Sequence, residues 1–181
     1  MVRAFIAVEI SDAARQKIVQ ATEPLQRGLE GVKWVDRENL HLTLRFLGDI
    51  EPDDVALLED IMKARFRGAA GPSIQLKRIG HFPRVVWVGI EGDLAGLRSL
   101  WERAQTSARE LGLGPDDHGF SPHVTIARIK EPGAIAKLKK RLEPVSESDF
   151  GSMTIGRVAL FESRLSPNGP TYVPLYDVAL K

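Results

Sequence analysis

The chain repeats its main sequence signals at an offset of 80 to 82 residues, which restricts it to folds with two similar halves. His41 and His123 lie 123 − 41 = 82 residues apart, and Pro52 and Pro132, which each open an expected helix, lie 132 − 52 = 80 apart. A nearly constant offset indicates an internal duplication. Any chain of alternating strands and helices shows some regularity, but here the matched strands also share a four-residue motif.

The two halves have the same order of expected elements: strand, helix, strand, helix, strand. From the periodicity of apolar residues, we expect strands at 2–10, 40–47 and 73–80 and helices at 12–29 and from 52 to the glycine at 68. The second half is expected to have strands at 84–90 and 121–129, helices at 93–111 and 132–142, and closing strands at 153–164 and 171–180. No low-complexity linker separates the halves, so we predict one bilobed domain over residues 1–181, with repeats at roughly 1–81 and 82–181.

The strand at 40–47 decides between two fold classes. Alternating strands and helices are typical of a parallel sheet covered by helices on both faces. However, apolar Leu40, Leu42 and Leu44 alternate with polar His41 and Thr43, and strands of parallel sheets are usually buried on both sides. We therefore predict an α+β fold in which sheets present one face to a cleft.

Composition excludes several classes of protein. The 181 residues carry 25 − 24 = +1 formal charge, so no strong basic field marks a nonspecific nucleic-acid coat. The chain has no cysteine, which removes disulfides, thiolate metal sites and cysteine nucleophiles and is compatible with a reducing cytoplasm. The apolar run at 2–10 is too short and too charged for a signal peptide or a membrane span, so we expect a cytoplasmic protein without a membrane partner.

Two of the four histidines lie in matching motifs, His41-Leu42-Thr43-Leu44 and His123-Val124-Thr125-Ile126. Residues two apart on a strand point to the same side, so each histidine shares a face with its threonine. If the repeats face each other, two imidazoles and two hydroxyls line one cleft.

This set of groups suits phosphoester chemistry without a metal. One imidazole can remove a proton from the attacking water or hydroxyl, and the other can protonate the leaving oxygen, because histidine supplies both forms near neutral pH. The threonine hydroxyls can donate hydrogen bonds to the phosphate oxygens. A metal site is the rival interpretation, but the nearest acidic residues, Asp49, Asp116 and Asp117, have no familiar ligand spacing.

Several segments together resemble one known family. They are 3–7 (Arg-Ala-Phe-Ile-Ala), 41–48 (His-Leu-Thr-Leu-Arg-Phe-Leu-Gly), 80–83 with 86–89, 120–128 (Phe-Ser-Pro-His-Val-Thr-Ile-Ala-Arg), and 162–163 with the turn at 169–172. In this order and spacing they resemble the 2H phosphoesterases, and within them the RNA 2′,3′-cyclic phosphodiesterases, also called the 2′-5′ RNA ligase family.

The resemblance implies two mainly antiparallel sheets flanking a central cleft, with the helices outside. It also implies hydrolysis of RNA 2′,3′-cyclic phosphate ends to 2′-phosphomonoesters without a metal or cofactor. Carried over from the family, His41 is the proton donor to the departing 3′ oxygen, and His123 activates water. The reverse reaction with a 5′-hydroxyl RNA end would give a 2′-5′ linkage.

Further substrate contacts are expected beyond the paired motifs. Strict alternation puts Arg45 on the His41 face, where its charge can meet a phosphate, although a solvated strand-edge arginine fits equally well. Arg128 resembles a phosphate contact of the family, but its odd spacing from His123 requires a bulge or a strand end. Phe82, in an expected turn, is the candidate for stacking on a base.

Three alternatives remain open at this stage. The substrate can be a small cyclic nucleotide or a cyclic sugar phosphate instead of an RNA end, because the motif does not separate them. The chain can also be a noncatalytic RNA-binding module, although binding alone does not require two proton-transfer groups. We expect a monomer that acts on RNA ends or nucleotides bearing a 2′,3′-cyclic phosphate. We also expect His81 and His118 to be loop or surface histidines.

Overall fold

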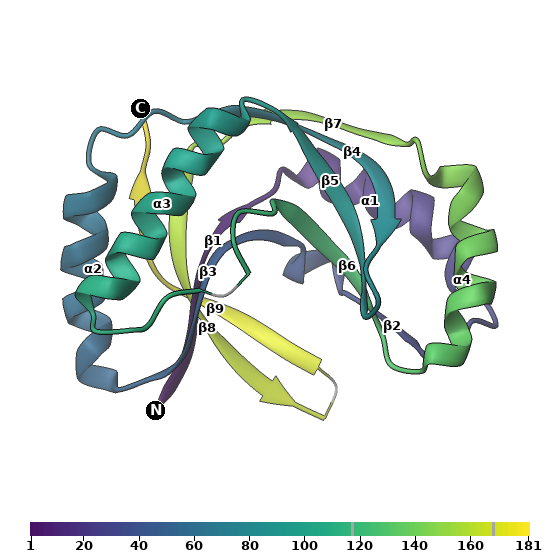
Figure 1. Ribbon diagram of the computed structural model, residues 1–181, viewed down its shortest axis with the longest axis horizontal. Helices are drawn as coiled ribbons and strands as arrows, with labels where there is room; N and C mark the ends of the chain where they lie inside the picture. Colours follow the sequence, from purple (N-terminus) through teal and green to yellow (C-terminus); the bar gives the residue numbers. More distant parts are fainter. Residues whose placement is uncertain (117, 168) are drawn as a thin grey trace.

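The computed structural model describes residues 1–116, 118–167 and 169–181, so Asp117 lies outside the described residues. The strands are β1 (Val2–Glu9), β2 (Val32–Trp34), β3 (His41–Ile50), β4 (Ser73–His81), β5 (Val85–Gly92), β6 (His123–Ile129), β7 (Asp149–Thr154), β8 (Arg157–Ser166) and β9 (Gly169–Ala179). The α-helices are α1 (Asp12–Gln26), α2 (Pro52–Phe66), α3 (Leu94–Glu110) and α4 (Ile135–Leu142), and short 3₁₀ turns lie at Arg37–Asn39, Pro132–Ala134 and Glu143–Val145. Figure 1 shows their arrangement.

Helix starts follow local capping chemistry. The Ser11 side chain accepts a hydrogen bond from the backbone N–H of Ala14 (3.2 Å), and the Asp93 side chain accepts one from Gly96 (2.8 Å). Each bond satisfies a backbone donor that has no partner within the helix. α2 instead begins at Pro52, whose fixed φ suits the first helical position. The predicted helix starts at 12, 52 and 93 are therefore confirmed within one residue.

The strands form one continuous sheet in the order β7-β4-β5-β6-β3-β1-β8-β9, with β2 paired to β6, and every pairing in the described residues is antiparallel. The α+β class is confirmed, but the expectation of two separate sheets is wrong. The halves are joined where Leu42 of β3 pairs with Val124 of β6. These are equivalent positions of the two motifs, so a pseudo-twofold axis passes between the catalytic candidates.

Two strand predictions need correction. The segment 153–164 was expected to be one strand, but β7 ends at Thr154 and β8 begins at Arg157, so the chain changes direction there. The three-residue strand β2 was not expected, because it is too short to show an alternating pattern.

Helices from opposite halves pack in pairs outside the curled sheet (Figure 1). α2 and α3 lie together at one end, where Arg65 forms an ion pair with Glu110. α1 and α4 lie at the other end, where Arg141 donates a hydrogen bond to the carbonyl of Leu25 at 2.6 Å. These contacts join helices from the first half of the chain to helices from the second half.

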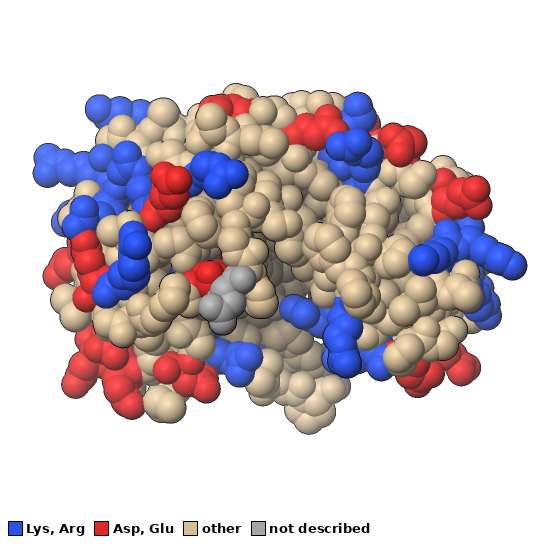
Figure 2. All heavy atoms as spheres, viewed as in Figure 1, with Lys and Arg blue, Asp and Glu red and all other residues tan. Residues whose placement is uncertain are grey.

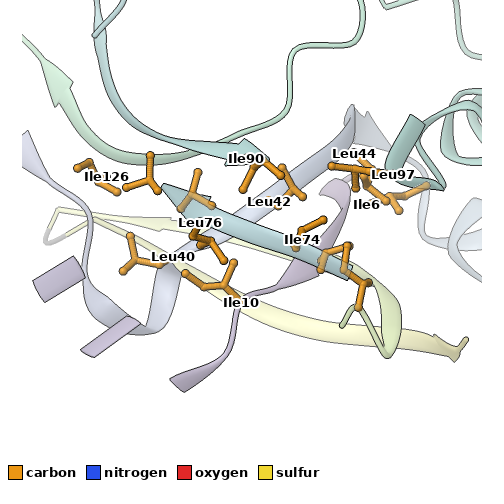
Figure 3. Close-up of a cluster of buried hydrophobic side chains, with 14 of the residues drawn as sticks. Ile6, Ile10, Leu40, Leu42, Leu44, Ile74, Leu76, Ile90, Leu97 and Ile126 are labelled. Carbon is orange, nitrogen blue, oxygen red and sulfur yellow. The ribbon is translucent and has the colours of Figure 1, made fainter. Parts of the chain in front are cut away.

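The core lies between the helices and the convex face of the sheet, and Figure 3 shows part of it. Ile6 and Leu160 are completely buried, as are Leu76 and Leu97. Phe5 and Ala7 point to the opposite face of β1, where they form a second, smaller cluster with Phe161. Both faces of β1 are therefore covered, which makes it a rigid support for the neighbouring strand β3. No helix among the described residues is both long and apolar enough to cross a membrane.

Candidate active site

A cavity of about 670 Å³ opens on the concave face of the molecule, and Figure 2 shows the hollow. Its lining includes His41 and Thr43 from β3 and His123 and Thr125 from β6. The structure therefore brings together all four residues of the predicted paired motif, from positions 82 residues apart in the chain.

Both histidines are held by the same backbone contact. His41 Nδ1 lies 2.6 Å from the carbonyl oxygen of Asn39, and His123 Nδ1 lies 2.8 Å from that of Ser121. A carbonyl only accepts hydrogen bonds, so Nδ1 carries the proton in both rings. Nε2 of each ring is then left for chemistry in the cavity, as a base when neutral and as an acid when protonated.

The surroundings of the two rings differ. His41 lies against Phe5 (4.9 Å between ring centres) and Tyr172 (5.1 Å), and its Nε2 lies 2.9 Å from the Thr43 hydroxyl. Burial lowers the pKa of His41 from 6.5 to about 4, with a smaller contribution from the positive charge of Arg128. His41 is therefore neutral at pH 7, and its Nε2 accepts a hydrogen bond from Thr43.

Matching bulges change which residues face the cavity. Against β1, Arg45 and Thr43 pair with consecutive residues, so Leu44 is an extra residue in β3. Against β5, Ala127 and Thr125 pair with consecutive residues, so Ile126 is an extra residue in β6. Both extra residues follow a motif threonine directly, so each strand reverses its facing at the same point.

The bulge in β6 puts Arg128 on the cavity wall as an exposed residue, as the predicted phosphate contact requires. The bulge in β3 has the opposite effect on Arg45. The expectation that strict alternation keeps Arg45 on the His41 face is wrong, because Arg45 is only 6% exposed and Phe46 takes the exposed position.

Arg45 is committed to partners within the protein. Its guanidinium donates hydrogen bonds to the Gln105 side chain (3.0 Å) and to the Gly114 carbonyl (2.5 Å), and lies 3.5 Å from an Asp116 carboxylate oxygen. Arg45 also belongs to the lining of the cavity. Arg45 thus fastens the segment after α3 to β3, and direct contact with substrate stays a prediction.

The structure places Phe82, His81 and His118 in different surroundings. Phe82 is 40% exposed and meets the His123 ring edge-on at 5.6 Å, but it lines a separate pocket beside His123 rather than the main cavity. Its role in stacking on a base stays a prediction. His118 is exposed and lies outside the strands and helices, as expected, and it also lies on the wall of the main cavity, whereas His81 is the partly buried last residue of β4.

Some cavity residues were not predicted. Phe46 is 57% exposed on one wall, and Tyr172 contributes from the hairpin of β8 and β9. Lys33 and Lys130 add positive charge. Counting five residues on from each motif histidine leads to Phe46 and Arg128, but only the bulges show that both face the cavity.

In the described part of the chain, no three histidine, aspartate or glutamate side chains come together as a metal-binding group. The polar groups on the cavity lining include imidazole, hydroxyl and cationic side chains, which can exchange protons with a phosphodiester and bind its oxygens.

The chain is similar to one protein family and to several known proteins. The LigT-like phosphoesterase family matches residues 8–87 and again residues 88–172. An RNA 2′,3′-cyclic phosphodiesterase of Methanothermobacter thermautotrophicus is 31% identical over 179 residues, covering 96% of each chain. One of Aeropyrum pernix is 35% identical over 153 residues, covering 81% of this chain and 85% of the relative.

Solved structures of two similar proteins have the same fold. A protein of Thermus thermophilus superposes with a TM-score of 0.80 at 29% identity, covering 98% of this chain and 97% of the other. E. coli LigT in complex with 3′-AMP superposes with a TM-score of 0.80 at 25% identity, covering 99% and 98%. The duplicated family match over nearly the whole chain agrees with the paired motifs in one cavity, and the chain therefore belongs to the LigT-like phosphoesterases.

Proposed function

We propose that this protein hydrolyses RNA 2′,3′-cyclic phosphate ends to 2′-phosphomonoesters by metal-independent acid–base catalysis with His41 and His123. The observation that carries this proposal is the convergence of both His–Thr pairs on one cavity, each ring fixed with Nε2 available. The relatives named RNA 2′,3′-cyclic phosphodiesterase support the same substrate class.

The reaction needs one proton removed and one delivered. Water attacks phosphorus while His123 Nε2 takes its proton, a P–O bond to water forms, and the bond to the 3′ oxygen breaks. His41 Nε2 gives a proton to that oxygen, and the phosphate remains on the 2′ oxygen. Attacking and leaving oxygens lie roughly in line across phosphorus, so an acid and a base from opposite halves suit this geometry.

The donor role of His41 depends on the bound substrate. Burial keeps the ring neutral by lowering its pKa. A phosphodiester carries a negative charge, and an opposite charge within about 4–6 Å favours the protonated imidazole. Substrate binding thus raises the pKa of His41 and supplies the acid where the leaving oxygen lies.

Three further residues bind the phosphate in this proposal. Thr43 turns its hydroxyl from His41 Nε2, 2.9 Å away, to a phosphate oxygen once that nitrogen is protonated. Thr125 donates from the equivalent position on the other wall. The Arg128 guanidinium provides positive charge for the same group.

The test is product analysis in the presence of EDTA. RNA oligonucleotides and mononucleotides that end in a 2′,3′-cyclic phosphate are incubated with the protein, and the position of the product phosphate is determined. We expect a 2′-phosphomonoester. A 3′-phosphate product, or activity that requires a divalent metal ion, would refute the proposal.

The same groups can join a 2′,3′-cyclic phosphate end to a 5′-hydroxyl RNA: the 5′ oxygen attacks phosphorus, the bond to the 3′ oxygen breaks, His41 protonates that oxygen, and a 2′-5′ linkage forms. His123 would then take the proton of the 5′-hydroxyl in place of water. Adding a 5′-hydroxyl oligonucleotide to the same assay and looking for a longer product measures this ligation directly.

A further inference from the structure

The two walls of the cavity differ in chemistry although the fold repeats. Phe46 and Gly48 follow His41 by five and seven residues, and Arg128 and Lys130 follow His123 by the same intervals. All four line the cavity. At these equivalent positions the two walls therefore differ: one carries an aromatic ring and a glycine, and the other carries two cations.

We propose that the cationic wall, formed by Lys33, Arg128 and Lys130, binds a second RNA phosphate next to the one that reacts. This inference rests on the proposed function, because it assigns what lies beside the reacting phosphate of that substrate. It extends the substrate class from a cyclic mononucleotide to an RNA segment with at least one further phosphodiester.

The register of β2 and β6 places these cations together. Lys33 pairs directly with Arg128 across the two strands, and Lys130 follows Arg128 by two residues, beyond the bulge. All three side chains are exposed. Like charges directly opposite each other on neighbouring strands are destabilising, so this pairing is explained by an anion that binds between them.

The cationic wall has little internal compensation. None of the ion pairs in the described residues involves Lys33, Arg128 or Lys130. The acidic side chains described on the cavity lining are Asp36 and Asp116, and Asp116 lies 3.5 Å from Arg45. Lysine and arginine atoms also border the hollow in Figure 2. A phosphate on this wall therefore meets more positive than negative charge.

The three cations of the wall differ in how near they lie to the motif histidines. Lys33 lies on β2, outside both motifs. Its Nζ lies beside Gly169, 3.4 Å from the position that a Cβ atom on this glycine would take, so the ammonium reaches toward the β8–β9 turn. Arg128 lies closer to the chemistry, because its charge lowers the pKa of His41. Arg128 thus serves the reacting phosphate as well, and Lys33 and Lys130 are the residues that report on the second one.

The second RNA phosphate can belong to either of two RNA strands. It can be the phosphate immediately upstream in the strand that ends in the cyclic phosphate, or a phosphate of a 5′-hydroxyl strand that enters for ligation. A dinucleotide with a cyclic phosphate end contains the first source. A cyclic mononucleotide mixed with a 5′-hydroxyl dinucleotide contains only the second.

The experiment compares Lys33→Gln and Lys130→Gln with Lys63→Gln, an exposed lysine on α2 outside the cavity. We measure kcat/KM on the dinucleotide and on the mononucleotide that end in a 2′,3′-cyclic phosphate. We also measure ligation of this mononucleotide to the 5′-hydroxyl dinucleotide. An exposed charge pair contributes up to about 1 kcal/mol, so we expect the ratio of dinucleotide to mononucleotide kcat/KM to fall by about three- to fivefold per variant. A similar fall confined to ligation would assign the phosphate to the entering strand.

Salt dependence and binding complete the test. Each lost phosphate contact lowers the slope of log affinity against log salt by about 0.7 for a single strand. Lys33→Arg should restore the ratio, because it keeps the charge. Unchanged ratios and unchanged ligation in both glutamine variants would overturn the inference. Calorimetric binding of a dinucleotide and a mononucleotide 2′-phosphate needs no turnover, so a lost preference there supports the cationic wall even if the proposed hydrolysis fails.

Discussion

The buried ring of His41 makes protein stability depend on pH in a way that can be calculated. Its pKa is 6.5 in an unfolded chain and about 4 in the folded protein, because burial disfavours the charged ring. Between these values the unfolded chain binds a proton that the folded chain does not. The free energy of unfolding therefore falls as pH is lowered through this window, and this contribution is fully present above pH 6.5.

The size of the effect follows from the shift. Because folding lowers the pKa from 6.5 to about 4, this contribution amounts to about 3 kcal/mol once both states are protonated, and about 2 kcal/mol of it is already lost at pH 5. Carboxylates also titrate at low pH, so the wild-type curve alone does not isolate His41. The difference between wild type and His41→Gln does, because the variant lacks this one group.

The assay is urea denaturation at pH 7.5, 6 and 5, with His81→Gln as the control at a histidine outside the main cavity. Between pH 7.5 and 5 wild type should lose about 2 kcal/mol more unfolding free energy than His41→Gln. The His81→Gln variant controls for the loss of one imidazole outside that cavity. Parallel curves for His41→Gln and wild type would show that burial does not depress the pKa of His41.

Three further results are expected. His41 donates a proton, so its deprotonation removes activity as pH rises, and this alkaline limb should lie at higher pH in kcat than in kcat/KM because the bound phosphodiester raises the pKa of His41; an alkaline limb at the same pH in both profiles would contradict this account. Arg45→Met should lower the free energy of unfolding by about 3 kcal/mol in chemical denaturation, because it leaves the Asp116 carboxylate without its partner; a change below 1 kcal/mol would show that the network is not needed. Thr125→Val should lower kcat by about 10²-fold while KM changes less, if its hydroxyl stabilises charge in the transition state. If Thr125→Val lowers kcat/KM equally but only by raising KM, the hydroxyl acts in ground-state binding of the substrate.

Local sequence patterns predicted most elements because capping residues and apolar periodicity act over a few residues. The Ser11 and Asp93 caps and the proline at 52 fixed the helix starts. The paired motif predicted which residues share a cavity, since the duplication relates His41 and His123 by one operation. These features depend only on neighbours along the chain or on the repeat.

Features that depend on pairing between distant strands were not predictable. The bulges at Leu44 and Ile126 arise from register against β1 and β5, and they reverse the facing expected for Arg45. Whether the sheet is one or two depends on a single pair, Leu42 with Val124. Tyr172 enters the cavity from the last hairpin, and no local pattern places it beside His41.

The measurement that tests the paired-histidine mechanism most directly is kcat/KM for RNA 2′,3′-cyclic phosphate hydrolysis by His41→Ala, His123→Ala, the double variant and the control His81→Ala. Acid and base act in one step, so each single variant should lose about 10²–10⁴-fold. The double variant should be little worse than the poorer single variant, because the two groups act as a unit. His81→Ala should match wild type. If either His41→Ala or His123→Ala keeps a tenth or more of the wild-type kcat/KM while folded, the two histidines are not the acid and the base of this reaction.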